Sequence, residues 1–116
     1  MSPAELLRVY VERHNGGVHA GGFAGLRALF AEDAAMRFHG IVVGPFLGVE
    51  AILAAFATSP PDDELVILEQ VGVEAVYAWA RDPLKPAGRL RITVARGRIA
   101  AIDVTAEMDR PEPRDS

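Results

Sequence analysis

Residues 34–56, AAMRFHGIVVGPFLGVEAILAAF, form the stretch around which the rest of the chain is arranged. Its first six residues are half apolar and stop at a glycine, which predicts a short β-strand. A region rich in glycine and proline follows. Glu50 then suits the first turn of a helix, because a carboxylate stabilises the positive end of the helix dipole. The crossing from strand to helix places Arg37, Phe38 and His39 at the wall or rim of whatever the helix covers.

Outside this stretch, apolar spacing and turn residues predict two further helices and four consecutive strands. One helix begins at Ser2-Pro3 and ends near Asn15-Gly16-Gly17, because serine caps helices and glycine ends them. A short helix covers about 23–30, and the predicted strands are 65–71, 73–81, 89–95 and 98–106, the last two joined as a hairpin at Arg96-Gly97. Helices followed by antiparallel strands predict an α+β fold, in which a curved sheet wraps around three helices and leaves a conical hollow.

Length and composition narrow the classes of protein to consider. The 116 residues favour one domain over 1–107, followed by a charged tail over 108–116 that we expect to be flexible. The net charge of −4 gives no electrostatic reason to expect nucleic acid as a partner. Neither a membrane span nor a signal peptide is expected, since no run of eighteen apolar residues occurs and the N-terminus lacks the signal pattern. The absence of cysteine excludes disulfides and thiolate metal sites, and a cytoplasmic location is the default expectation.

The predicted strands carry more apolar positions than one layer of short helices can cover. Alternate residues of a strand face opposite sides of a sheet, so the following five cannot all point inward: Val71, Tyr77, Trp79, Ile92 and Val94. A second copy of the chain on the outer face would bury the remainder. We therefore predict a homodimer formed through the outer face of the sheet.

Three segments, FAGLRALFAEDAAMRFHG, GPFLGVEAILAAF and GRIAAIDV, resemble the nuclear transport factor 2-like (NTF2-like) superfamily. The resemblance runs from about Leu6 to Val104 and rests on motifs of the scaffold. It implies the cone-shaped α+β fold shared by ketosteroid isomerases, polyketide cyclases of the SnoaL type and limonene epoxide hydrolases. The superfamily also contains proteins without catalytic activity, so the fold alone does not imply an enzyme.

Compared with the isomerases, the chain keeps the tyrosine and lacks both carboxylates. Those enzymes set a tyrosine and a protonated aspartic acid against an aspartate base. Tyr10 takes the position of the tyrosine, Phe38 stands at the position of the base beside His39, and Arg91 stands at that of the aspartic acid. Asp103 is the one acid in the core of the last strands, and it lies one residue out of step with the last-strand aspartate of the epoxide hydrolases.

The predicted hairpin leaves open which of its faces lines the cavity. A regular pairing about its turn sets Arg91 opposite Ile102. The superfamily pattern turns inward the face with Arg89, Arg91, Thr93, Ala100, Ile102 and Val104. The apolar pattern favours the other face, with Leu90, Ile92, Val94, Ile99, Ala101 and Asp103. We take the superfamily orientation as the working prediction.

The candidate site combines a few polar groups with apolar walls, as small-molecule sites usually do. The candidate catalytic residues are Tyr10 as a hydrogen-bond donor, with His39 and Asp103 as possible bases. Ligand contacts are expected from His14, Met36, Phe38, Trp79, Arg91, Ile102 and Val104. Structural roles compete with these: core packing for the tyrosine and the tryptophan, a solvated strand end for His39, and the outer sheet face for the arginine. The spacing of the three histidines follows no metal-ligand pattern, so neither a metal nor a cofactor is expected.

Two function classes remain open from the sequence. The first is an enzyme that isomerises, cyclises, hydrates or hydrolyses a small hydrophobic molecule, with Tyr10 as donor and His39 or Asp103 as base. The second is a non-catalytic ligand-binding or dimerisation module with the same cone. The missing carboxylates favour the second class, whereas Tyr10 and its neighbouring histidines support the first.

Overall fold

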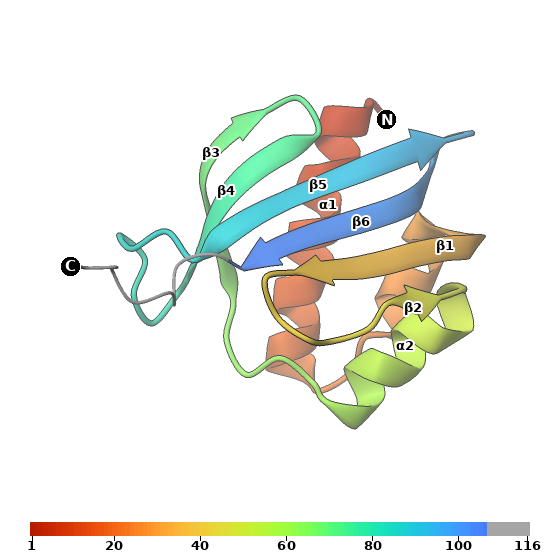
Figure 1. The fold of residues 1–116 in the computed structure, drawn as a ribbon, viewed down its shortest axis with the longest axis horizontal. Coiled ribbons are helices and arrows are strands. Elements are labelled where there is room, and N and C mark those ends of the chain that lie inside the picture. Colours follow the sequence, from red (N-terminus) through yellow and green to blue (C-terminus); the bar gives the residue numbers. More distant parts are fainter. Residues whose placement is uncertain (107–116) are drawn as a thin grey trace.

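A sheet and a set of helices on one of its faces make up the computed structural model of the chain (Figure 1). The structure describes residues 1–106, so the tail predicted over 108–116 lies outside it. The helices are α1 (Pro3–Ala20), the 3-10 helix η1 (Ala24–Leu29) and α2 (Val49–Thr58). The strands are β1 (Phe30–His39), β2 (Phe46–Leu47), β3 (Leu65–Val71), β4 (Glu74–Trp79), β5 (Gly88–Ala95) and β6 (Arg98–Ala106). Among residues 1–106, no helix has the length and apolar character needed to cross a membrane.

The six strands form one curved, open sheet in the order β2-β1-β6-β5-β4-β3. β1 runs parallel to β6, and all other neighbouring strands are antiparallel. In Figure 1, α1 crosses behind β5 and β6, and α2 lies close to β1 and β2. The α+β fold predicted from the sequence, with a curved sheet around three helices, is confirmed.

α1 begins where the sequence predicts and continues beyond its predicted end. The hydroxyl of Ser2 accepts a hydrogen bond from the Glu5 N–H, and the Glu5 carboxylate accepts one from the Ser2 N–H. The helix ends before Gly21, which has a left-handed φ of 80°. Gly17 is buried against the Phe23 ring, where an added Cβ would collide. This close packing outweighs the cost of a glycine within a helix, about 1 kcal/mol.

The first strand begins earlier than predicted, and the second strand has no counterpart in the prediction. β1 begins at Phe30 instead of Ala34, and its register with β6 shifts between Phe30 and Ala35. The sequence does not predict β2, which pairs with Ala35 and Met36 of β1. This strand has only two residues and is surrounded by glycines and prolines, so it has no alternating apolar pattern that would predict it. Such residues are nevertheless common beside edge strands.

A β-bulge decides which residues of the last hairpin face the helices. The register shifts between Thr93 and Val94, so Arg91 pairs with Asp103 and not with Ile102. An extra residue in one strand reverses the alternation of faces from that point on. The buried, inward-facing residues are consequently Leu90, Ile92, Ile102 and Val104. Both predicted faces are wrong in part, because β5 and Ile99 follow the apolar pattern, whereas Ile102 and Val104, beyond the bulge, follow the superfamily pattern.

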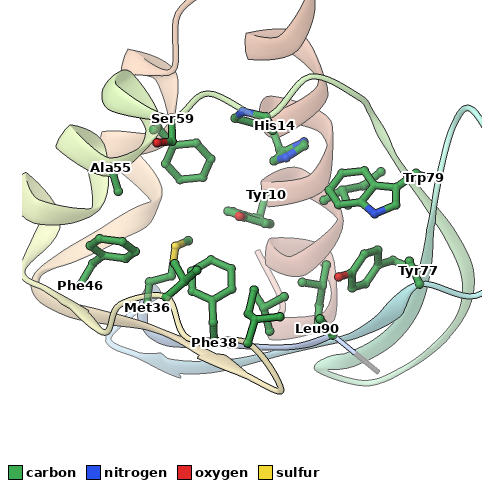
Figure 2. Close-up of a pocket in the computed structure, with 18 of the residues that line it drawn as sticks. Tyr10, His14, Met36, Phe38, Phe46, Ala55, Ser59, Tyr77, Trp79 and Leu90 are labelled. Atoms are coloured by element: carbon green, nitrogen blue, oxygen red, sulfur yellow. The ribbon is translucent and has the colours of Figure 1, made fainter. Parts of the chain in front are cut away.

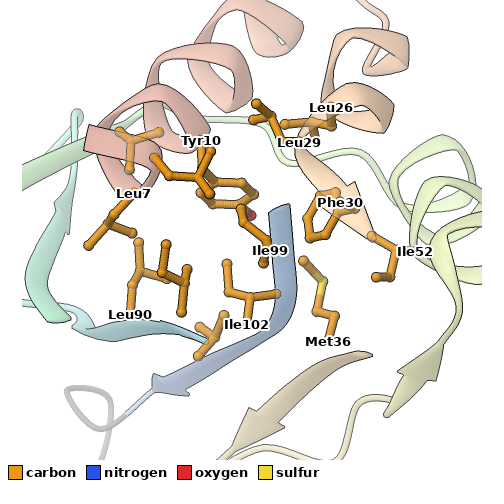
Figure 3. Packing of buried hydrophobic residues seen from close by; sticks show 14 of the residues in the cluster. Leu7, Tyr10, Leu26, Leu29, Phe30, Met36, Ile52, Leu90, Ile99 and Ile102 are labelled. Atoms are coloured by element: carbon orange, nitrogen blue, oxygen red, sulfur yellow. The ribbon is translucent and has the colours of Figure 1, made fainter. Parts of the chain in front are cut away.

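The core lies between the inner face of the sheet and the helices (Figure 3). In Figure 3, Tyr10 of α1 lies close to Ile99 of β6, and Leu7 and Ile102 belong to the same buried cluster. The largest fully buried side chains are Phe30, Leu7, Leu26, Ile52, Ile92, Ile99 and Ile102. All belong to one contact cluster, so helices and sheet share a single hydrophobic core.

The outer face of the sheet is more polar than the homodimer prediction assumes. Tyr77 and Ile92, two of the residues behind that prediction, are only 4% and 1% exposed and belong to the core. The outer face instead carries charged side chains, and Arg91 lies 3.6 Å from Glu74 across it. The homodimer stays a prediction, with less apolar surface to motivate it than the sequence suggests.

Candidate functional site

A cavity of about 950 Å³ lies between the inner face of the sheet, α1 and α2 (Figure 2). Its apolar walls include Met36 and Phe38 of β1, Phe46 of β2, Trp79 of β4 and Leu90 of β5. Met36 and Phe38 reach the same space because alternate residues of a strand share a face. This size and composition are typical of a small-molecule site.

The mouth of the cavity combines exposed apolar and charged side chains. Ile41 and Val43, between β1 and β2, line it and are 47% and 44% exposed. The charged residues that line it, Arg81, Asp82 and Lys85, follow β4 and are all exposed. A ligand inside the cavity therefore meets charged side chains only near the entrance.

Tyr10 lies on the buried stripe of α1 and projects into the cavity (Figure 2). It is 3% exposed, and its ring meets the Phe30 ring edge-on at a centroid distance of 6.1 Å. No residue within 1–106 forms a hydrogen bond with its hydroxyl. Burial, helped by the neighbouring Tyr77, raises the pKa of Tyr10, so the hydroxyl keeps its proton and can donate it.

His14 stands one turn further along α1, among aromatic rings. Its ring centroid lies 6.3 Å from Tyr10, 6.3 Å from Phe23 and 6.2 Å from Phe56. It is 4% exposed and lines the cavity, and it is the one buried histidine within 1–106. Burial lowers the pKa of His14, against the opposing effects of the Asn15 hydrogen bond and the Glu64 charge. The imidazole is therefore neutral at pH 7.

Asn15 ties α1 to the first residue of β3. Its Oδ1 accepts a hydrogen bond from the Leu65 N–H at 2.8 Å, and its Nδ2 donates to the Leu65 carbonyl at 2.9 Å. The same Oδ1 lies 3.0 Å from Nδ1 of His14. Sequence reasoning missed this residue because an asparagine before two glycines is typical of a helix end. No local signal reveals its partner fifty residues away.

The three predicted catalytic residues do not share one site. His39 and Asp103 do come together, with Nε2 of His39 2.9 Å from Oδ1 of Asp103. They line a separate hollow on the outer face of the sheet, where Arg37 lies 3.8 Å from the same carboxylate oxygen. Strand alternation explains this placement: Phe38 faces the cavity, so its neighbours face outward. Tyr10 is therefore left without either predicted base.

The predicted ligand contacts divide among three locations. Those that line the cavity are His14, Met36, Phe38, Trp79 and Val104. Ile102 is fully buried in the core cluster. The Arg91 side chain is 64% exposed on the outer face, because it alternates with the inward-facing Leu90 and Ile92 of β5. Within residues 1–106, no three possible metal ligands come together.

Solved structures resemble this chain over most of its length. An NTF2-like protein from Cytophaga hutchinsonii has a TM-score of 0.66 at 13% identity, over 92% of this chain and 91% of the other. The chain has the NTF2-like fold. The predicted cone corresponds to the space between the curved sheet and the helices, where Tyr10 and His14 lie.

Two other structures with similar architecture have names that point to ligands. A computationally designed 17-OHP binder has a TM-score of 0.65 at 18% identity, over 94% of each chain. A proposed polyketide cyclase from Sinorhizobium meliloti has a TM-score of 0.58 at 23% identity, over 82% of this chain and 92% of the other. No protein-family model and no curated protein matches the chain. Likeness at such low identity concerns the fold and does not determine the function of this chain.

Proposed function

We propose that the protein binds a small, mainly apolar molecule in the cavity and holds one oxygen atom of that molecule with the Tyr10 hydroxyl. The observation that carries the proposal is that this hydroxyl is buried and has no partner within residues 1–106. Buried polar groups are normally hydrogen-bonded, and leaving one unpaired costs about 1–3 kcal/mol. A ligand oxygen would remove that cost.

The walls of the cavity support the apolar part of the proposal. Aromatic and aliphatic side chains from all six strands, α1 and α2 line it, whereas the charged lining residues are exposed at the mouth. The designed 17-OHP binder with a similar fold has a steroid ligand, and the other neighbour is a proposed polyketide cyclase. Both names suit a cavity for a hydrophobic molecule that carries oxygen.

Trp79 provides a direct measurement, since it lines the cavity and is the one tryptophan in the chain. Native mass spectrometry of freshly purified protein should reveal any retained molecule, and 17-OHP serves as the first titration probe. We expect 17-OHP to change the Trp79 emission and Tyr10→Phe to weaken its binding about fivefold, the effect of roughly 1 kcal/mol.

The stability of the same variant is the control. Tyr10→Phe removes a hydroxyl that has no partner within residues 1–106, so we expect no loss of thermal stability. Unchanged affinity in a stable variant would remove Tyr10 from the site. Reduced stability would show that its hydroxyl has a structural partner in solution.

Acid–base catalysis, as in an isomerase, cyclase or hydrolase, is the second candidate function, and His14 is the observation in its favour. This neutral imidazole shares the cavity with the Tyr10 hydroxyl, so a donor and a possible base converge on one space. The standard isomerase carboxylates are absent, because Phe38 forms part of the wall and Arg91 points outward. Turnover that is lost in both Tyr10→Phe and His14→Phe would support the enzyme, and binding without turnover supports the non-catalytic module.

A further inference from the structure

The hydrogen bonds around His14 determine which of its ring nitrogens faces a ligand as an acceptor. Building on the proposed function, we infer that the bound molecule carries a hydroxyl or enol O–H group that donates a hydrogen bond to Nε2 of His14. The ligand class is then an apolar alcohol, phenol or enol with a second oxygen for Tyr10.

The orientation of the Asn15 amide follows from its two bonds to the Leu65 backbone. A backbone N–H only donates and a carbonyl only accepts, so the atom 2.8 Å from the Leu65 nitrogen is the amide oxygen. The atom 2.9 Å from the Leu65 carbonyl is then the NH₂ group. Exchanging the two would set donor against donor and acceptor against acceptor. The amide is held in one orientation by β3.

This orientation fixes the tautomer of the imidazole. Nδ1 of His14 lies 3.0 Å from the Asn15 oxygen, which can only accept, so Nδ1 carries the proton and donates it. A neutral imidazole has one N–H, so Nε2 is left with a lone pair. Asn15 acts here as a positioning residue, because it orients His14 without lining the cavity itself.

Nε2 has no hydrogen-bond partner among residues 1–106, although His14 is only 4% exposed. The Tyr10 hydroxyl is likewise buried and has no hydrogen-bond partner among residues 1–106. The ring centroids of Tyr10 and His14 lie 6.3 Å apart. A donor and an acceptor are thus both unpaired in one cavity with mainly apolar walls. One molecule with an oxygen acceptor and an O–H donor would satisfy both atoms.

Three probes of one ring system test the acceptor by isothermal titration calorimetry: 2-naphthol, 2-methoxynaphthalene and naphthalene. Only the naphthol can donate a hydrogen bond, and naphthalene shows whether the methyl group of the ether fails to fit. We expect the wild type to bind 2-naphthol about fivefold to tenfold more tightly than the other two. In His14→Phe, which keeps a ring of similar size, the affinities of 2-naphthol and 2-methoxynaphthalene should converge, because only the naphthol can donate to His14. His19→Gln is the matched control, since His19 is an exposed histidine of α1 outside the cavity lining.

Each outcome separates this inference from the proposed function. Equal affinities of 2-naphthol and 2-methoxynaphthalene in the wild type overturn the inference and leave an apolar binding cavity in place. A preference for the naphthol over the ether that survives in His14→Phe also overturns it. If none of the three probes binds although 17-OHP does, the inference is overturned and the proposed function stands, whereas failure of 17-OHP as well overturns both.

A second measurement uses the wild-type protein alone and does not depend on the folding of a variant. Nitrogen NMR of the imidazole rings distinguishes a protonated from an unprotonated ring nitrogen. We expect His14 to carry its proton on Nδ1 at pH 7. A proton on Nε2 would contradict the inference directly.

Discussion

Tyr10 and His14 occupy equivalent positions on successive turns of α1, and this spacing brings their rings to 6.3 Å from one another. Each keeps a polar atom within largely apolar surroundings. The placement of the Tyr10 hydroxyl in the cavity follows from its position on the buried stripe of α1 alone. His14 also needs Asn15, which sets its tautomer and is itself held by β3. Chemistry at the residue scale thus already depends on a distant strand.

The neutral state of His14 predicts a pH dependence of stability. Its pKa is lowered below the ordinary 6.5 in the folded protein, chiefly by burial and despite the charge of Glu64. Between that lowered value and 6.5 the unfolded chain binds more protons than the folded one, so stability rises with pH. We expect the free energy of unfolding to decrease as pH falls from about 6.5 toward about 5, measured by urea unfolding.

Variants of His14 and His19 test whether this pH dependence of stability comes from His14. His14→Phe should flatten the dependence in that range, whereas His19→Gln should retain it, because His19 is exposed and pairs with Glu64 on the surface. The carboxyls with lowered pKa, Glu5, Glu50 and Asp63, lose their contribution at lower pH. Identical profiles for the wild type and His14→Phe would show that burial of this imidazole does not control stability.

At the scale of elements, the bulge in the last hairpin has the largest consequence. The extra residue near Ala100 lets Leu90 and Ile92 of β5 and Val104 of β6 face inward together. A regular hairpin cannot do this, because paired residues share a face and a regular pairing would set Asp103, not Val104, opposite Leu90. The same bulge places Asp103 on the outer face, opposite Arg91, and so keeps its carboxylate out of the cavity.

The link between α1 and β3 leads to a prediction at this scale. Asn15→Leu leaves the N–H and carbonyl of the buried Leu65 without their side-chain partner. We expect chemical denaturation to show a loss of about 1–3 kcal/mol, the cost of a buried unpaired group. Asn15→Asp keeps the acceptor for the N–H and should lose less. A free energy of unfolding within about 0.5 kcal/mol of the wild type would place the strand end in contact with water.

On the scale of the whole molecule, the two faces of the sheet have different character. The inner face, with the helices, encloses the core and the cavity, and its polar atoms are few. The outer face carries the pairs His39–Asp103 and Arg91–Glu74. The candidate bases predicted from the sequence therefore lie on the face that the sequence assigns to dimerisation.

This arrangement changes how the predicted homodimer should behave. A dimer through the outer face would rest on polar contacts, because the apolar residues behind the prediction, such as Tyr77, face inward. Exposed charges are screened by salt, so we expect a dimer in sedimentation at about 0.1 M salt and dissociation toward about 1 M. Arg91→Glu places two acidic side chains together and should weaken it. A monomer at micromolar concentration in low salt would end the prediction.

Much of the scaffold is predictable because its signals are local. The capping box at Ser2 and Glu5 sets the start of α1, and the strands 65–71 and 98–106 have the predicted bounds. Sequence patterns gave the wrong bounds, or missed a strand, where a contact with a residue distant in the sequence determined the local structure. α1 continues past Asn15 because Gly17 packs on Phe23. β2 exists because β1 supplies its partner.

The sequence by itself determined the α+β architecture and the mainly apolar walls of the candidate site. Helical periodicity placed Tyr10 and His14 on one stripe, and strand alternation placed Met36 and Phe38 on one face. Only the tertiary structure decided which polar groups share the cavity. One bulge residue reverses a strand face, and one asparagine orients an imidazole by binding a residue fifty positions away. Neither effect has a local energetic signature, because each depends on partners that only the folded chain brings together.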